Sequence, residues 1–117
     1  MTSAVVTAAP DTSAVEVARL MRDHRVGSVV IVDPAGVPVA MVTDRDLAVR
    51  VLAEGTDPER PASAVASRPL ITGDPDMELD EAAALMVRHR VRRLPVVAEE
   101  RLAGIATLDD IAVRSGN

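Results

Sequence analysis

The chain of 117 residues contains no cysteine, no lysine, and no phenylalanine, tyrosine or tryptophan. The absence of cysteine excludes disulfides, thiolate zinc sites and thiol nucleophiles. Without those three aromatic residues, the chain has no side-chain platform on which a nucleic-acid base could stack. The absence of lysine excludes Schiff-base chemistry and the lysine of a phosphate-binding loop. Metal or acid–base chemistry would therefore depend on two histidines and 18 carboxylates.

The charge balance and the length of the apolar runs bear on binding to nucleic acid and to membranes. A net charge of −5 argues against general nucleic-acid binding, whose affinity comes largely from neutralised phosphates. No apolar run approaches the roughly 20 residues that span a bilayer. The start, Met1-Thr2-Ser3, lacks the basic and apolar regions of a signal peptide. We therefore expect a cytoplasmic protein that binds neither nucleic acid nor membrane.

The chain contains an internal repeat. Residues 5–11 align with residues 70–76 at an offset of 65. Further along, the offset falls to 64, where it aligns Thr43 with Thr107 and Asp46 with Asp110. The matches stay in register with a single slip of one residue, which indicates a duplication rather than chance identity.

Each half predicts the same order of elements: a strand and a helix, then two strands and a second helix. The sequence therefore predicts an α/β (α+β) fold of two β-α-β-β-α repeats packed with pseudo-twofold symmetry, at residues 1–54 and 62–117, with a connector at 55–61. Since a unit of roughly 50 residues buries little surface alone, we expect the halves to pack together and to leave ligand clefts between them. The predicted strands are at 4–6, 28–32, 37–42, 70–71, 94–97 and 102–106, and the predicted helices at 14–21, 44–54, 79–86 and 108–114.

The repeated motif Thr-x-x-Asp, at Thr43 to Asp46 and again at Thr107 to Asp110, lies where a strand ends and a helix begins. A helix N-terminus and a threonine hydroxyl both attract phosphate. A carboxylate one turn further can accept hydrogen bonds from the two hydroxyls of a ribose. The same spacing is also that of a capping box, in which the acid bonds back to the start of its own helix. The residues alone leave both interpretations open.

Five longer motifs recur in a fixed order along the chain. They are Val-Val-Thr-Ala-Ala-Pro-Asp-Thr (5–12), His-Arg-Val-Gly-Ser-Val-Val-Ile-Val-Asp (24–33), Ala-Met-Val-Thr-Asp-Arg-Asp-Leu (40–47), His-Arg-Val-Arg-Arg-Leu-Pro-Val-Val (89–97) and Gly-Ile-Ala-Thr-Leu-Asp-Asp-Ile (104–111). In their order and duplication, these motifs resemble the CBS domain, named for cystathionine β-synthase, in the tandem form called a Bateman module. The resemblance covers nearly the whole chain. It implies β-α-β-β-α units that act as sensors, bind adenine nucleotides or S-adenosylmethionine, and pair as homodimers.

The resemblance also implies the residues of two ligand sites, in which the aspartate holds the ribose, the threonine approaches the phosphate, and aliphatic and backbone groups hold the adenine. The first site comprises Thr7, Val26, Met41, Thr43, Arg45 and Asp46, and the second comprises Thr72, Val91, Arg93, Ile105, Thr107 and Asp110. Either Arg92 or Arg93, which replace Gly27 and Ser28 of the first half, could reach a phosphate. In that case, the two sites would differ in charge preference.

Three functions follow from these observations. The first is a non-catalytic module that binds AMP, ADP, ATP or S-adenosylmethionine as a regulatory ligand and signals to a partner protein by conformational change. The second is a ligand-free structural or dimerisation module whose Thr-x-x-Asp motifs are only helix caps. The third is a nucleotide hydrolase, for which the sequence supplies neither an activated nucleophile nor an oriented base. We predict no metal site, because His24 and His89 have no second ligand at metal spacing.

Overall fold

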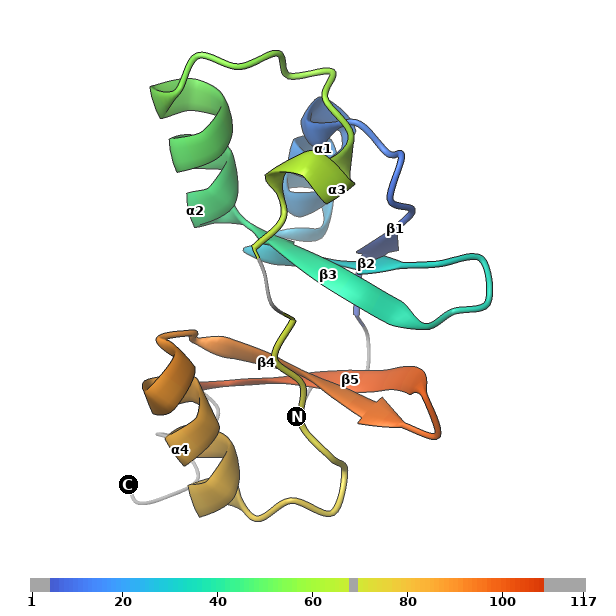
Figure 1. Ribbon diagram of the computed structural model, residues 1–117, viewed down its shortest axis with the longest axis vertical. Coiled ribbons are helices and arrows are strands. Elements are labelled where there is room, and N and C mark those ends of the chain that lie inside the picture. Colours follow the sequence, from blue (N-terminus) through green and yellow to red (C-terminus); the bar gives the residue numbers. More distant parts are fainter. Residues whose placement is uncertain (1–4, 68–69, 109–117) are drawn as a thin grey trace. The chain divides into compact units, whose positions relative to one another are not determined.

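The computed structural model in Figure 1 describes residues 5–67 and 70–108. The chain divides into two compact units. One unit is Val6–Leu70, and the other holds the described residues of 1–5 and 71–117. Each unit mixes strands and helices, which confirms the predicted fold class.

The first unit has the predicted order of elements and one additional short helix, α3, in a segment for which the sequence predicted none. In Figure 1, η1 continues α2 as one coil. The π-helix has hydrogen bonds that reach five residues back, for example from Glu54 N–H to Val49 O at 3.1 Å. The elements are β1 (Thr7–Ala8), α1 (Ala14–His24), β2 (Ser28–Val32), β3 (Pro38–Thr43), α2 (Asp44–Asp46), the π-helix η1 (Leu47–Ala53) and α3 (Ala62–Val65).

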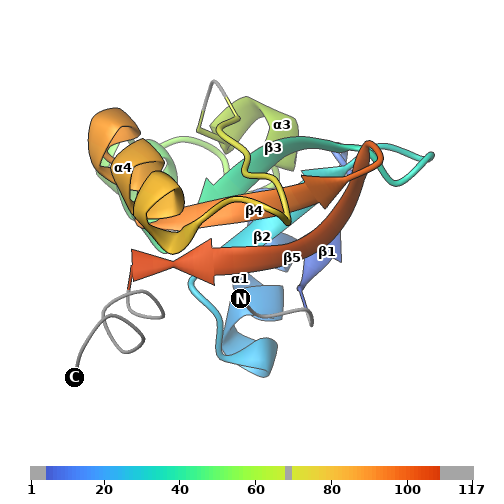
Figure 2. The same ribbon diagram turned by 90° about the horizontal axis from the view of Figure 1, so that it is seen from below.

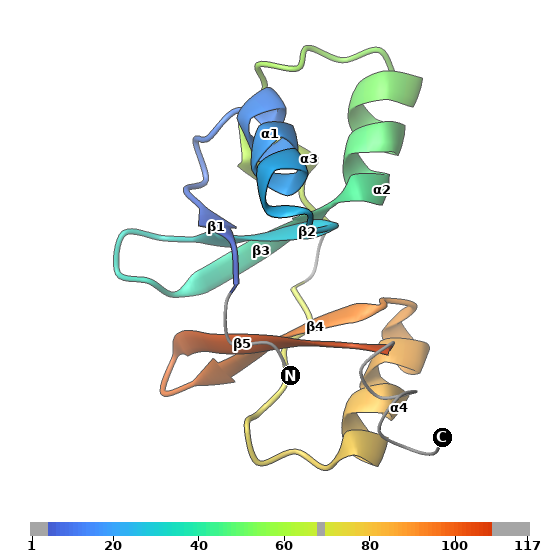
Figure 3. The same ribbon diagram turned by 180° about the vertical axis from the view of Figure 1, so that it is seen from behind.

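The sheet of the first unit has the order β1-β2-β3, with β1 parallel to β2 and β3 antiparallel to it. Because side chains alternate between the faces of a sheet, every second residue of β2 and β3 faces the helices. All the helices of this unit lie on that same side of the sheet (Figure 3). The core between them consists of Ala14, Val17, Met21, Val29, Ile31, Ala40, Val42, Val51, Ala62, Val65 and Ala66. This packing fixes the end of β3 and the start of α2, where the first Thr-x-x-Asp motif lies.

The second unit contains α4 (Leu79–His89), β4 (Arg93–Ala98) and β5 (Arg101–Thr107), and Figure 2 shows the two strands side by side. Met86 and Leu94 are fully buried in its own core cluster. Of the predicted helix at 108–114, all but Leu108 lies outside the described residues.

The predicted strands at 4–6 and 70–71 are displaced. In the first unit, the paired residues are Thr7–Ala8, and Val30 N–H donates to Val6 O at 3.0 Å. The residue equivalent to Val30 in the second unit is Pro95, which has no N–H to donate. Pairing there is reduced to one parallel bridge between Gly73 and Val96.

Both long helices end on an arginine in the left-handed conformation, a position that usually favours glycine. Arg25 has φ 56° after α1, and Arg90 has φ 58° after α4. The backbone N–H of Arg25 donates to Met21 O, and that of Arg90 donates to Met86 O. The duplication is therefore conserved in backbone geometry as well as in sequence.

The two units fill one pair of equivalent positions with side chains of different size. A Cβ on Gly73 would lie only 2.8 Å from the Cδ2 atom of Leu94, which is 1% exposed. At the offset of 65, Ala8 and Val29 hold these positions in the first unit. The second unit therefore combines a glycine with a leucine at two equivalent positions where the first unit has an alanine and a valine.

Gly73→Ala should lower the free energy of unfolding by about 1–3 kcal/mol, because the added methyl overpacks the core against Leu94. Adding Leu94→Val should recover part of that loss, although Leu94→Val alone should cost about 1 kcal/mol. Urea denaturation of the wild type, both single variants and the double variant measures the coupling. Strictly additive costs would show that the two side chains do not compete for the same space.

Candidate functional site

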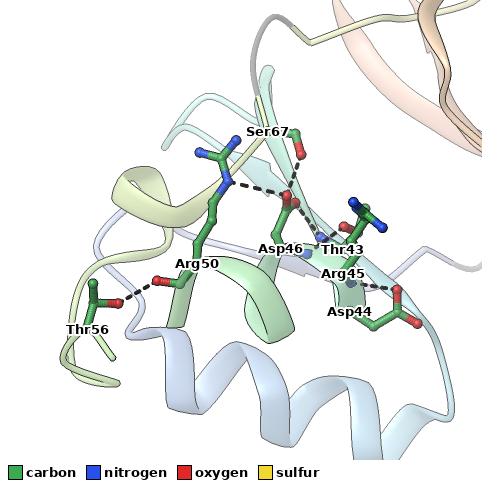
Figure 4. Close-up of polar contacts among 7 residues, drawn as sticks. All are labelled: Thr43, Asp44, Arg45, Asp46, Arg50, Thr56 and Ser67. Atoms are coloured by element: carbon green, nitrogen blue, oxygen red, sulfur yellow. Dashed lines mark hydrogen bonds and ion pairs between the residues drawn. The ribbon is translucent and has the colours of Figure 1, made fainter. Parts of the chain in front are cut away.

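The first Thr-x-x-Asp motif forms a capping box at the junction of β3 and α2 (Figure 4). Thr43 Oγ1 accepts a hydrogen bond from Asp46 N–H at 3.1 Å, and Asp46 Oδ2 accepts one from Thr43 N–H at 2.9 Å. The capping interpretation therefore describes these two side chains correctly. The box uses only one of the two carboxylate oxygens of Asp46.

The other oxygen, Asp46 Oδ1, accepts a hydrogen bond from a residue far along the chain. Ser67 Oγ–H donates to it at 2.6 Å, across 21 positions in sequence (Figure 4). The backbone N–H of Ser67 donates to Met41 O at 3.1 Å. Arg50 Nε lies 3.7 Å from the same Asp46 oxygen. This carboxylate therefore joins β3, α2, η1 and the segment after α3.

Burial makes these contacts necessary. Asp46 is 6% exposed, although an ionised carboxylate is stable in the interior only when hydrogen bonds replace its water. The hydrogen bonds from Thr43 N–H and the Ser67 hydroxyl supply that replacement, and the Arg50 guanidinium adds an ion pair. Asp44 and Arg45, in the same turn, are exposed. Asp46 is thus the oriented acid of the motif, while Arg45 has its side chain in solvent.

The sequence did not predict the roles of Ser67 and Arg50. Arg50 carried a usable signal, since it follows Asp46 by four residues on a predicted helix, a spacing that favours ion pairs. The repeat offset of 65 aligns Ser67 with Thr2, so both positions carry a hydroxyl. No local pattern, however, connects Ser67 with Asp46.

The structure brings together most of the residues predicted for the first site. Thr7 lies opposite Val30 in β2, and Val30 lies opposite Met41 in β3, so these residues form one row across the sheet. Thr43 follows two positions after Met41 and shares its face, which is the face away from the helices. Val26 is the exception, because it packs against the hydrophobic core.

The second unit repeats this arrangement with a different charge. Arg93 lies directly opposite Thr107, at the register position where the first unit pairs Ser28 with Thr43. Side chains opposite each other in an antiparallel pair have Cβ atoms about 5 Å apart. Ile105 shares their face, since it lies two residues before Thr107.

Two of the remaining residues of the predicted second site, Thr72 and Val91, lie in the part of the chain that the structure describes. Thr72 directly precedes the bridge residue Gly73, and Val91 packs against the second core cluster, as Val26 does in the first. Asp110 lies outside the described residues. Of the two candidate arginines, Arg93 is therefore the one that the register places beside Thr107.

Comparison with known proteins matches the family model of the CBS domain twice, at residues 1–53 and 62–115. The chain belongs to the CBS-domain family. A curated relative, the CBS domain-containing protein YhcV of Bacillus subtilis, is 44% identical over 113 residues, which are 97% of this chain and 80% of that protein. The resemblance stated from the motifs is thereby confirmed.

Solved structures of CBS proteins superpose on nearly the whole chain. Hypoxic Response Protein I with two coordinated zinc ions has a TM-score of 0.88 at 32% identity and covers 99% of this chain and 95% of its own. PAE2072 from Pyrobaculum aerophilum, complexed with AMP, has a TM-score of 0.86 at 30% identity. The match covers 94% of this chain and 85% of that protein. The CBS domain pair of MJ0100, in complex with 5′-methylthioadenosine and S-adenosyl-L-methionine, has a TM-score of 0.87 at 27% identity. The match covers 97% of this chain and 89% of that protein.

Within residues 5–67 and 70–108, no group of three or more histidine, aspartate or glutamate side chains is arranged to hold a metal ion. No helix in the same ranges has the length and apolar character to cross a membrane.

Removing the capping box should destabilise the first unit. Thr43→Ala should lower the free energy of unfolding by about 1 kcal/mol, the usual effect of losing a cap. Asp46→Ala should cost more, about 1–3 kcal/mol, because it also leaves the Ser67 hydroxyl without its acceptor. The double variant should cost less than the sum, since both residues serve one motif.

Urea denaturation measures these differences, and Asp44→Ala is the matched control. Asp44 is an exposed carboxylate in the same turn, so its removal should change stability by only about 0.5 kcal/mol. Equal effects of Asp44→Ala and Asp46→Ala would contradict a structural role for the buried acid.

Proposed function

We propose that this chain is a non-catalytic regulatory module that binds an adenosine-containing ligand, such as AMP, ADP, ATP or S-adenosylmethionine. In this proposal the repeats at 1–54 and 62–117, with the connector at 55–61, act as one Bateman module with a ligand site in each repeat. The observation that carries the proposal is the buried, oriented carboxylate of Asp46 at the end of β3, in a chain similar to CBS proteins that were solved with AMP or S-adenosylmethionine.

The chemistry of the first site fits a ribose. Asp46 presents a carboxylate whose orientation is set by the cap, and a carboxylate is the natural acceptor for the hydroxyls of a sugar. Thr43, one turn earlier, places a hydroxyl at the N-terminus of α2, where a phosphate is favoured. The adjacent sheet face supplies Thr7 and Met41, with backbone groups and aliphatic surface for a purine.

The two sites differ in charge. Arg93 adds a guanidinium beside Thr107, where the first repeat has the uncharged, buried Ser28. Because guanidinium groups bind phosphate with two parallel hydrogen bonds, the second site suits nucleotides with one or more phosphates. The first site then suits ligands whose affinity comes from the nucleoside.

Ligand binding would regulate by population shift. A ligand that binds one arrangement of the module more tightly than another moves the equilibrium by that difference in affinity and by no more. A partner protein, and a second copy of the chain in a homodimer, would respond to the change. Exposed apolar residues on η1, Val49 at 40% and Leu52 at 79%, offer surface for such contacts.

A second candidate function, a ligand-free structural module, is favoured by the capping box itself, which accounts for Thr43 and Asp46 without any ligand. Thermal denaturation with AMP, ADP, ATP and S-adenosylmethionine separates the two. A ligand at about 100 times its dissociation constant should stabilise the fold by roughly 2.7 kcal/mol. Unchanged melting with all four ligands would favour the structural module. Chromatography of the incubated nucleotides should recover them intact if the module is non-catalytic.

Arg93→Ser gives the second repeat the residue of the first. The substitution should weaken the binding of AMP, ADP and ATP at least about tenfold, because a hydrogen bond to a charged group contributes roughly 1.5–3 kcal/mol. The affinity for adenosine, which has no phosphate, should remain nearly unchanged. Arg92→Ser, at the exposed neighbouring position, is the matched control for lost charge. An equal loss for adenosine and AMP would contradict the assigned phosphate contact.

A further inference from the structure

We propose that Ser67 is a built-in competitor for the first ligand site, whose hydroxyl occupies the carboxylate oxygen that a ribose hydroxyl would use. This inference rests on the proposed function, because it concerns the same Asp46. It adds a residue that determines the affinity of the site, and it connects ligand binding to the segment directly after α3.

Within the described residues, Ser67 donates hydrogen bonds to two predicted residues of the first site, Asp46 and Met41. Its hydroxyl donates to Asp46 Oδ1 at 2.6 Å (Figure 4). Its backbone N–H donates to Met41 O at 3.1 Å. An isolated antiparallel bridge holds Ser67 beside Met41. Ser67 is thus bonded both to the predicted ribose acceptor and to the backbone of a predicted adenine contact.

The serine hydroxyl reproduces the chemistry of the proposed ligand. An aliphatic O–H that donates to a carboxylate is the interaction that a ribose would make. Asp46 Oδ2 accepts from Thr43 N–H, and Oδ1 is the oxygen to which the Ser67 hydroxyl donates. The Asp46 side chain is only 8% exposed. A diol therefore reaches Oδ1 when Ser67 moves away, and the ligand exchanges one donor for another.

Displacement of Ser67 would act on the chain directly after an anchored helix. Ala62 and Val65 in α3 are completely buried in the first core, and Ala66 is 2% exposed. The segment up to Ala66 is therefore fixed, and the displacement falls on Ser67 itself. Occupancy of the first site would in this way change the position of the chain directly after α3.

Titration calorimetry of the full chain with AMP and with S-adenosylmethionine tests the proposal. Ser67→Ala removes the competing donor, so the first site should bind about tenfold more tightly, the equivalent of one hydrogen bond to a charged group. Ser67→Thr keeps a hydroxyl and should bind as the wild type does. The matched control is Thr56→Val, which removes a hydroxyl of the same unit that donates to Arg50 O at 2.6 Å rather than to Asp46.

Amide hydrogen exchange of the wild-type chain provides a readout that needs no variant. Saturating AMP or S-adenosylmethionine should speed exchange at the Ser67 amide, because displacement breaks its bond to Met41 O. Unchanged or slower exchange at Ser67 in the saturated protein would overturn the proposal.

The outcomes separate this proposal from the function on which it rests. If the wild type binds at the first site and Ser67→Ala binds equally or more weakly, Ser67 is no competitor and the proposed function stands. If neither the wild type nor Ser67→Ala binds any member of the panel, both proposals are wrong. Tighter binding by Ser67→Ala, with Thr56→Val unchanged, supports both.

Discussion

The carboxylate of Asp46 imposes the central constraint on the first unit. A buried charge must recover in contacts within the protein what it loses in hydration. Asp46 does so through hydrogen bonds from Thr43 N–H and the Ser67 hydroxyl, and through an ion pair with Arg50 at 3.7 Å. Its bond to Thr43 N–H fixes where β3 ends and α2 begins. Its bond to Ser67 holds the segment after α3 against the sheet. One side chain therefore sets the start of a helix and the course of a segment that leaves the unit.

Comparison of the two repeats shows which features of the core and of the strand pairing can be exchanged. Gly73 with Leu94, and Ala8 with Val29, fill comparable space with different side chains, as expected when a core constrains total volume more than residue identity. Pro95, by contrast, removes a hydrogen-bond donor that no change of volume restores, and the first strand is reduced to a bridge. The two repeats therefore share packing closely and backbone pairing less closely.

The order of elements could be predicted from the sequence because it depends on local periodicity and on the repeat. Helical spacing located α1 and α4, and β-branched runs located β2 and β4. The short α3 could not be predicted, since four residues carry no helical period. The capping box was predictable because its residues are three positions apart, whereas the contact of Ser67 with Asp46 spans 21 positions and exists only in the folded unit. Arg93 was predictable as a candidate, but only the strand register placed it opposite Thr107.

The two interpretations of Thr-x-x-Asp are compatible in the structure. A carboxylate has two oxygens with about four acceptor positions, and the cap at Asp46 uses Oδ2 while Ser67 uses Oδ1. A cap of this kind orients the acid before any ligand arrives, which lowers the cost of ordering the site on binding. Helix capping and ribose binding thus need not compete for Asp46. In the proposed site, the competition would lie between the ligand and Ser67, and a single hydroxyl would set its strength.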